Sequence, residues 1–279
     1  MEHSAEFLPS LADIAPGVWN EIAGEDYPFL RHEFLYGLEE TGCTTAETGW
    51  QPCHLLLRES DRIIAVMPLY LKSHSYGEYV FDWSWADAWR RSGLDYYPNL
   101  LTAIPFPPAT GPRLCVRAPR REEDLWPVVM QAIRGFAQRQ NISSWHLLFP
   151  QESVSRELLG LGAHRRTATQ FHWFNDGYAS FDEFLGTFTS RKRKNLRRER
   201  ARVAEQGLEL LTLTGPEISE GDWLRFYRFY QMTYAKRSGH AGYLTRDFFL
   251  QTAPNLGAGV VMAVARQAGE AVAGALYVP

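Results

Sequence analysis

The sequence has 279 residues, of which 45% are hydrophobic, and this is enough to form the cores of more than one domain. Its formal net charge of −3 argues against a protein that binds nucleic acid over its whole surface. The three cysteines, Cys43, Cys53 and Cys115, form no CxxC pair. The first residues, MEHSAEFLPS, lack a signal-peptide pattern, and no apolar run is long enough to span a bilayer. These features predict a soluble cytoplasmic protein without a membrane span, in which any contact with a polyanion is local.

The first part of the chain alternates between helical and extended patterns. We expect an amphipathic helix around Gly17–Gly42, then a hairpin of His54–Leu57 and Ile63–Leu71 across the polar turn RESDR. The elements expected after it are an extended Tyr79–Trp85, a helix over Ala86–Ala103, a strand at Arg113–Val116, a helix at Asp124–Gln140, a strand at Trp145–Phe149, a helix at Ser153–Leu161 and a strand at Thr167–Phe174. This order predicts an α/β layer structure with a mixed sheet.

The turn-rich segment Asn175–Ala179 is the predicted boundary between a first domain, residues 1–175, and a second domain, residues 176–279. Beyond it, Phe181–Phe188 has the apolar spacing of an amphipathic helix. A second helix is expected to begin with Ser190 as its cap and to stop at Gly207. The elements expected after these are a strand at Leu208–Leu213, a helix at Trp223–Ala235 and a closing hairpin with its turn at Gln267–Glu270.

The closing hairpin repeats the layout of the first one. HLLLRESDRIIAVMPLYL and VVMAVARQAGEAVAGALYV each contain an apolar strand, a polar turn and a second strand that ends near Leu-Tyr. This internal similarity indicates a duplicated domain. Because the second copy stops at Pro279 inside an apolar strand, we expect the second domain to be truncated.

Three stretches of this duplicated pattern resemble a known family. SRKRKNLRRERARVAEQG, MPLYLKSHSYGEYVFDWSWADA and YYPNLLTAIPFPPATGPRL are similar to the FemAB-like peptidoglycan biosynthesis/recognition proteins, which are regarded as N-acyltransferases with tandem GNAT-type domains. The resemblance runs from Phe29 to the end of the chain. It implies two GNAT-like domains with mixed sheets.

The same resemblance implies a function. It suggests an N-acyltransferase that moves an acyl or aminoacyl group onto an amine of a peptidoglycan-type precursor, with acyl-CoA or aminoacyl-tRNA as the donor. Two alternatives stay open. One is a non-catalytic protein that recognises peptidoglycan or an amino compound with a degenerate GNAT fold, and the other is a tRNA-dependent aminoacyltransferase.

Acyl transfer to an amine needs a general base and donors for the oxyanion, but no enzyme nucleophile. A literal match to the Gln/Arg-x-x-Gly-x-Gly/Ala loop for a pyrophosphate occurs at Arg266–Ala271, in a predicted hairpin turn with no helix after it, so we reject it. The segment RAPRREED before the helix Asp124–Gln140 has no glycine. The first domain is therefore expected to lack an ordinary acetyl-CoA site.

The segment from Arg191 to Arg202 is strongly basic, since eight of its twelve residues are Lys or Arg. Such a run is often only a solvated surface. However, Arg191–Lys194 are consecutive, so they surround the helix axis, and cations in a first turn oppose the helix dipole. Phosphates of CoA, of a nucleotide-linked precursor or of tRNA would offset that repulsion. The candidate donor-binding residues are Arg191, Lys192, Arg193, Lys194, Arg197 and Arg198.

The aromatic and acidic stretch FDWSWADAW, from Phe81 to Trp89, is either a core strand that leads into a helix or a platform for the acceptor. On a platform, Asp87 or Asp82 would receive the amine as general base; Asp87 is preferred, although no spacing rule separates the two. The rigid segment PFPPATGPR is either a structural loop or a pocket wall. The candidate substrate-binding residues are Trp83, Trp85, Tyr96, Tyr97 and Arg113, the last facing an anion.

Two further expectations concern histidines. His172 and Trp173 are expected in the core or at the seam between the domains, because they lie on a strand with alternating neighbours. The eight histidines have no metal-ligand spacing, so no metal is expected.

Overall fold

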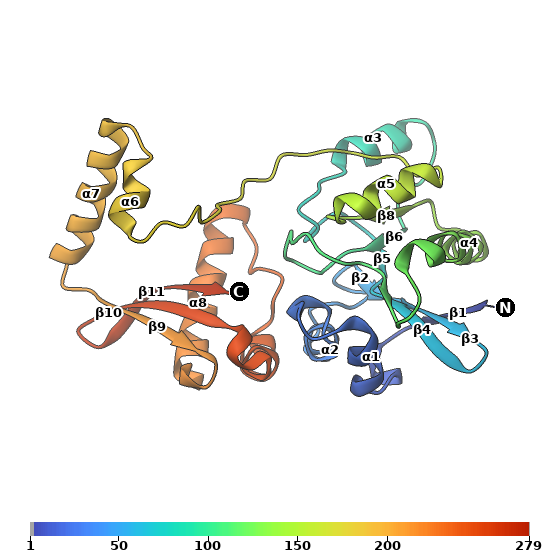
Figure 1. The fold of residues 1–279 in the computed structure, drawn as a ribbon, viewed down its shortest axis with the longest axis horizontal. Coiled ribbons are helices and arrows are strands. Elements are labelled where there is room, and N and C mark those ends of the chain that lie inside the picture. The colour runs from blue at the N-terminus through green and yellow to red at the C-terminus, as the bar shows by residue number, and fades with distance from the viewer. Residues whose placement is uncertain (1–2, 279) are drawn as a thin grey trace.

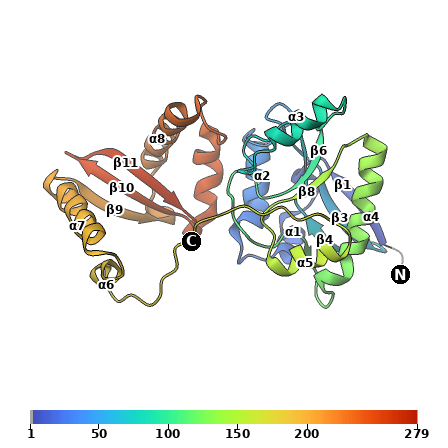
Figure 2. The same cartoon turned by 90° about the horizontal axis from the view of Figure 1, so that it is seen from above.

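The computed structural model describes residues 3–278 of the chain. A first half (residues 3–161) and a second half (residues 181–278) are joined by an extended linker, residues 162–180 (Figure 1). Figure 2 shows the two halves lying side by side along the long axis. Both halves combine helices with sheets, and one sheet is mixed, which confirms the α/β class predicted from the order of elements.

The first half contains two sheets of four strands. The first has the order β1-β3-β4-β7 and is antiparallel, whereas the second has the order β2-β5-β6-β8 and is mixed, since β6 and β8 run parallel. The strands are β1 (His3–Leu8), β2 (Trp50–Pro52), β3 (His54–Glu59), β4 (Arg62–Met67), β5 (Tyr70–Lys72), β6 (Asn99–Thr102), β7 (Cys115–Val116) and β8 (Trp145–Leu147). The helices are η1 (Leu11–Asp13), α1 (Pro16–Ala23), η2 (Pro28–Leu30), α2 (His32–Glu40), α3 (Trp83–Arg91), α4 (Glu122–Gln140) and α5 (Glu152–Gly160).

The chain changes sheet at Pro68, between β4 and β5. Proline has no N–H to donate to a strand ladder, so the antiparallel pairing of β4 ends before it. Strand β5 then joins the second sheet, between β2 and β6. Its alternating pattern buries Tyr70 and Lys72 and leaves Leu71 half-buried. A lysine is thereby carried into the interior at the end of a strand.

The second half is a three-stranded antiparallel sheet of order β11-β10-β9, against which α8 packs. Its elements are α6 (Phe181–Gly186), α7 (Ser190–Glu205), β9 (Glu209–Thr214), η3 (Gly215–Glu217), α8 (Glu220–Ser238), η4 (Phe248–Thr252), η5 (Ala253–Gly259), β10 (Val261–Gln267) and β11 (Glu270–Tyr277). Helix α7 has no buried residue, and Figure 1 shows it beside α6 at the outer end of this half.

Most of the expected elements are confirmed. The hairpin β3-β4, the helices α4, α5 and α8, the strands β8 and β9 and the closing hairpin β10-β11 all lie within a few residues of their predicted positions. Their common feature is a clear apolar period with turn residues at both ends.

Four expectations were wrong in part. The single helix at 17–42 is two helices, because Gly24 adopts a left-handed φ of 77° and Pro28 begins a new turn. The segment 79–85 is not extended throughout, because helix α3 already begins at Trp83. The helix expected at 86–103 ends at Arg91, and the residues after Pro98 form the fully buried strand β6. The second helix after the boundary has Thr189, not Ser190, as its N-cap.

The segment 167–174 forms no strand. Its backbone is extended but pairs with no other strand among the described residues, and the side chain of Phe171 is 93% exposed. His172 and Trp173 are likewise exposed, so they are not core residues. Both lie in the linker between the halves, where the ring of Trp173 contacts Phe184 edge to face at 5.9 Å, so only the core reading of the expectation was wrong. Alternating apolar residues indicate a strand only where a neighbouring strand exists to pair with it.

The two halves share one hydrophobic core. Helix α2 of the first half packs on η4 of the second, where the rings of Phe34 and Phe248 meet edge to face with centroids 6.2 Å apart. The hydroxyl of Thr245 also donates a 2.9 Å hydrogen bond to the carbonyl of Thr41. At the closest point, a Cβ added to Gly37 would lie 2.3 Å from Cγ2 of the buried Thr252. A glycine is therefore required on this face of α2.

Gly37→Ala should lower the free energy of unfolding by about 2 kcal/mol, because the new methyl group overlaps the Thr252 side chain in a packed core. Gly17→Ala is the matched control: it also replaces a helical glycine, but nothing lies within 4 Å of the added Cβ. That control should be neutral or slightly stabilising. Urea unfolding followed by tryptophan fluorescence measures both, and equal effects would contradict the close packing of α2 on η4.

Candidate functional site

A buried ion pair lies where the end of β5 meets the loop that follows it. Nζ of Lys72 is 3.8 Å from Oε1 of Glu78 and donates a 3.3 Å hydrogen bond to the carbonyl of Tyr76. The same ammonium lies 3.8 Å from the ring centroid of Trp50, on strand β2. Both charged side chains are almost completely buried. Such a pair is costly to bury and marks a candidate functional site.

Burial moves the pKa values of both side chains toward neutral pH. It lowers the pKa of Lys72 to about 7, against the attraction of Glu78. It raises the pKa of Glu78 to about 8, against the attraction of Lys72 and with some help from the nearby Asp82 carboxylate. The pair can therefore take up and release a proton near neutral pH.

Hydroxyl groups connect this pair to Asp82. The Tyr96 hydroxyl donates a 2.6 Å hydrogen bond to Oδ2 of Asp82, whose own N–H donates to the Ser75 hydroxyl at 3.3 Å. The Ser75 and Tyr97 hydroxyls are 2.6 Å apart, and a hydrogen bond from Ser75 also favours the ionised form of Glu78. We call the six residues the polar cluster: Lys72, Ser75, Glu78, Asp82, Tyr96 and Tyr97.

The linker contributes one cation to this region. Nη2 of Arg166 lies 2.7 Å from Oδ1 of Asp82, and its guanidinium carbon lies 5.4 Å from the ring centroid of Trp85 on α3. Asp82 is buried, whereas the Arg166 side chain is 45% exposed. The start of the linker is thus tied to α3 by one ion pair and one cation–π contact.

Exposed aromatic rings surround the polar cluster. Each of them is at least 41% exposed, which is unusual for large apolar side chains and typical of a surface that binds something. Within the group, the ring of Trp83 contacts Tyr76 edge to face at 5.0 Å and stacks with Phe81 at 6.3 Å. We call these residues the aromatic platform: Tyr76, Tyr79, Phe81, Trp83 and Trp85.

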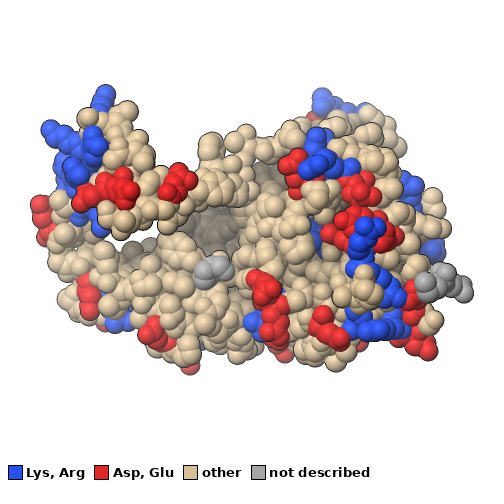
Figure 3. All heavy atoms as spheres, in the orientation of Figure 1, with Lys and Arg blue, Asp and Glu red and all other residues tan. Residues whose placement is uncertain are grey.

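The platform reaches the second half of the molecule. The Tyr79 hydroxyl is 3.0 Å from that of Tyr234 on α8, and the ring of Phe106 stacks on Tyr243 with centroids 5.2 Å apart. Figure 3 shows the surface hollowed between the two halves, below the linker. The loop between β5 and α3, which carries Glu78 of the polar cluster and Tyr79 of the platform, therefore lies at the border between the halves.

Of the site residues expected from sequence, Asp82, Tyr96 and Tyr97 come together in the polar cluster, and Trp83 and Trp85 in the platform. Asp87 lies apart on the exposed face of α3, where Arg90 donates a 2.5 Å hydrogen bond to it and Arg91 approaches to 3.0 Å. Arg113 is fully buried and donates to three backbone carbonyls, those of Leu148, Pro112 and Ala109. In this position Arg113 fastens the proline-rich loop.

Sequence reasoning missed Lys72, Ser75, Glu78 and Arg166. One signal was available in the sequence. Lys72 lies two residues after Tyr70 in an apolar strand, so the alternation of side chains places both on the same buried face. The burial of Glu78 had no such signal, because it lies in an irregular loop.

The basic residues of α7 form a separate exposed surface. Lys and Arg side chains gather over this helix in Figure 3, and Figures 1 and 2 both show α7 at the outer end of the second half, whereas α3 belongs to the first half. Two of its other arginines make local contacts: Arg197 pairs with Asp182 at 3.0 Å, and the Arg200 guanidinium lies 4.1 Å from the Phe181 ring centroid. The acceptor and donor residues expected from sequence are thus on different halves.

The start of α4 is unfavourable for a phosphate. Glu122, Glu123 and Asp124 occupy its first turn, where they repel an anion that the helix dipole would otherwise attract. Burial and the neighbouring Glu123 raise the pKa of Glu122 to about 7. The expectation that the first half lacks an ordinary acetyl-CoA site stays a prediction.

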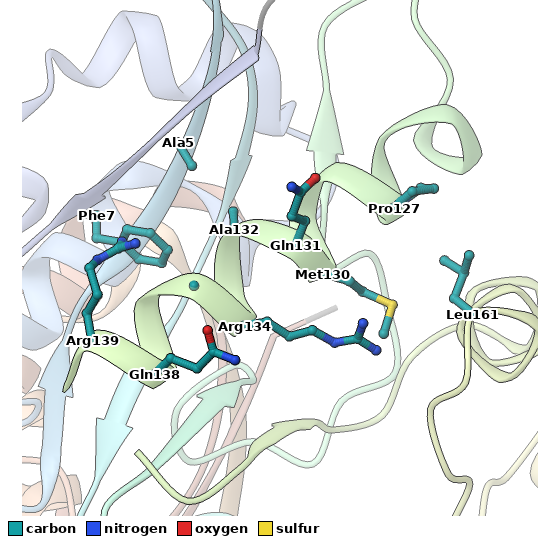
Figure 4. Close-up of a pocket in the computed structure, with 11 residues that line it drawn as sticks. Ala5, Phe7, Pro127, Met130, Gln131, Ala132, Arg134, Gln138, Arg139 and Leu161 are labelled. Carbon is teal, nitrogen blue, oxygen red and sulfur yellow. The ribbon is translucent and has the colours of Figure 1, made fainter. Parts of the chain in front are cut away.

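A shallow cavity of about 680 Å³ runs along α4 on another surface of the first half (Figure 4). It is lined by residues of β1 and α4, among them Phe7, Met130 and Arg134, together with Leu161. None of its lining residues belongs to the polar cluster or the platform.

Within residues 3–278, no group of three His, Cys, Asp or Glu side chains is placed to hold a metal ion. In the same part of the chain, no helix is both long and apolar enough to cross a membrane.

Three solved structures are similar to the chain at low identity. One is a GCN5-related N-acetyltransferase from Ralstonia eutropha JMP134, with 13% identity and a TM-score of 0.38 over 62% of this chain and 99% of that one. A tandem GNAT protein from the clavulanic acid biosynthesis pathway has 12% identity and a TM-score of 0.41 over 95% of this chain and 69% of its own. FemX has 11% identity and a TM-score of 0.43 over 95% of this chain, which spans 57% of the length of FemX. These scores are too low to support an argument about function.

No curated protein sequence matches the chain. The model of the FemAB-like family, described as peptidoglycan biosynthesis/recognition, matches residues 10–279. This range takes in the polar cluster, the platform, the linker and α7. The chain therefore belongs to the FemAB-like family of peptidoglycan biosynthesis/recognition proteins.

Proposed function

We propose that this protein is an N-acyltransferase that moves an acyl or aminoacyl group onto an amine of a peptidoglycan-type precursor. The observation that carries the proposal is the buried Lys72–Glu78 pair, whose charged groups are 3.8 Å apart beside exposed aromatic rings and whose pKa values burial moves to about 7 and about 8. The described role of the family supports the class of acceptor.

The reaction requires the acceptor ammonium to lose a proton before its nitrogen attacks the donor carbonyl. A base with a pKa near the working pH does this best, and the Lys72–Glu78 pair meets that condition. The half-buried Tyr97 hydroxyl and Ser75 form the path by which the proton reaches Glu78. The ammonium gives one proton to this base, which passes it to solvent, and the neutral amine attacks the carbonyl carbon. A C–N bond forms, the ester C–O or thioester C–S bond breaks, and a second proton of the attacking nitrogen passes to the leaving oxygen or sulfur.

The aromatic platform is suited to hold the acceptor. Exposed rings beside a small number of polar groups are typical of ligand sites, and the rings offer flat apolar faces to a sugar or an aliphatic amine. Because the loop that carries Tyr79 of the platform lies at the border between the halves, a donor held by the second half can approach an acceptor held by the first. In this proposal residues 1–175 form the acceptor domain and residues 176–279 the donor domain.

The position of α7 favours aminoacyl-tRNA over acyl-CoA as the donor. Its basic side chains are at the far end of the second half, and tRNA carries phosphates over a long distance from its ester. The acidic first turn of α4 opposes an acyl-CoA held by the first half only, and in this proposal that half holds the acceptor. Since both donors are cytoplasmic compounds, the proposal includes a cytoplasmic location. The residues proposed to contact phosphate are Arg191, Lys192, Arg193, Lys194, Arg197 and Arg198.

A second candidate is a non-catalytic recognition protein. It is favoured by the burial of Lys72 and Glu78 below the surface, since the platform could bind a precursor with no chemistry. The two candidates differ in whether a group is transferred.

The full chain, given labelled aminoacyl-tRNA or acyl-CoA and a nucleotide-linked muropeptide, should place the label on an amine of the muropeptide. Glu78→Gln should lower kcat by about 10²–10⁴-fold, which is the usual effect of losing a general base. Glu40→Gln, an exposed carboxylate on α2, is the control and should leave kcat unchanged. Mass spectrometry of the muropeptide gives the result; binding without transfer from either donor would make the protein a recognition module.

The free energy of unfolding should fall from pH 4.5 to about 8 in the wild type relative to Glu78→Gln. Glu78 has a pKa of about 8 when folded and about 4.5 when unfolded, so the folded state binds more protons in this window and loses stability as the pH rises. In the wild type, Lys72, with its pKa lowered to about 7, acts in the opposite direction above that pH. Glu78→Gln removes the attraction that raises the pKa of Lys72, so in the variant this gain in stability begins at a lower pH and widens the difference in the same direction. Urea unfolding across the window measures the difference, and parallel curves for the two proteins would contradict it.

Arg191→Glu combined with Lys194→Glu should weaken tRNA binding and reduce the slope of log K against log salt by about 2, one for each lost phosphate contact. The same change of charge at Arg134 and Arg139, two exposed cations of α4, is the control and should leave the slope unchanged. Filter binding at several salt concentrations measures it. Unaltered binding by the α7 variant would make this helix a solvated surface.

A further inference from the structure

Arg166 occupies a place that has the chemistry of a cation-binding site. Its guanidinium lies between a buried carboxylate, that of Asp82, and the face of an exposed ring, that of Trp85. A carboxylate together with an aromatic face is an arrangement that binds ammonium and guanidinium ligands. Here the occupant comes from the linker of the same chain.

Arg166 is the exposed partner of a buried group. Oδ2 of Asp82 accepts the 2.6 Å hydrogen bond from Tyr96, and Oδ1 has Nη2 of Arg166 as its partner at 2.7 Å. The Asp82 side chain is 5% exposed, whereas that of Arg166 is 45% exposed, so solvent and solutes can reach the cation of the pair. A ligand with an N–H aimed at Oδ1 could therefore replace Arg166.

Little else holds this part of the linker in place. The segment 167–174 has no regular structure, and Phe171, Trp173 and Phe174 are exposed. Among the described residues, its hydrogen bonding to the first half consists of the 2.6 Å bond from Gln170 to the carbonyl of Pro108. Displacement of Arg166 would consequently break few other contacts.

We propose that Asp82 and Trp85 form a binding site for an organic cation, a primary ammonium or guanidinium group, which Arg166 fills when no ligand is bound. The linker then closes the site, and a cationic acceptor opens it by taking the place of Arg166. The inference rests on the proposed function in one respect, namely that the acceptor is an amine. No covalent step is involved.

Isothermal titration with Nα-acetyl-lysine amide tests the proposal. Arg166→Ala should bind this probe about tenfold more tightly than the wild type, because the competing side chain is gone. Arg165→Ala, which removes the neighbouring exposed arginine, should behave as the wild type. Adding Asp82→Asn to Arg166→Ala should abolish the gain, and the uncharged Nα-acetyl-norleucine amide should bind to none of the variants.

Equal affinity of the wild type and Arg166→Ala for the lysine probe would overturn the proposal. A lower melting temperature of Arg166→Ala that millimolar probe does not restore would also overturn it, since Arg166 would then be purely structural. Arg166→Gln, which keeps a polar side chain of similar length, repeats the comparison if the alanine variant folds poorly. The measurement is one of binding, so an absence of acyl transfer would refute the proposed function and leave this result intact.

Discussion

The contact between Gly37 of α2 and Thr252 of η4 is the constraint on which the arrangement of the two halves depends. It lies within a core to which both halves contribute, so the second half does not simply hang from the linker. With α2 and η4 fixed, Tyr234 and Tyr243 are placed against Tyr79 and Phe106. The border at which the loop with Glu78 lies is therefore a consequence of core packing at a different point.

The Lys72–Glu78 pair is better explained by function than by stability. Two buried charges lose hydration that their mutual attraction regains only with good geometry, and theirs are 3.8 Å apart, with Oε1 of Glu78 accepting no hydrogen bond from a described residue. Apolar side chains of similar size would be expected to pack there at no loss. A pair kept in so unfavourable a state, with both pKa values moved toward neutrality, fits a role in proton exchange.

Much of the fold followed from periodicity, but the site followed only in part. Helix α4 and the hairpin β3-β4 have apolar patterns that need no knowledge of the rest of the chain. The shifted pKa of Glu78 depends on burial by residues distant in sequence, so no local pattern encodes it. Asp82 and Asp87 could have been separated, however: arginines at the third and fourth positions after Asp87 already predict an exposed ion pair on a helix.

The distribution of charge also limits the kind of substrate each half can receive. Because the whole chain has a net charge of −3, the cations of α7 act as a local attractive field for a polyanion. In the first half, the acidic start of α4 and the ion-paired Asp82 offer no comparable field. A polyanionic donor would thus be attracted to the end of the molecule remote from the polar cluster. In the proposed reaction, a donor that contacts α7 must be long enough to bring its ester from α7 to the border between the halves. That requirement is the physical reason why the proposal prefers a tRNA carrier to a compact coenzyme.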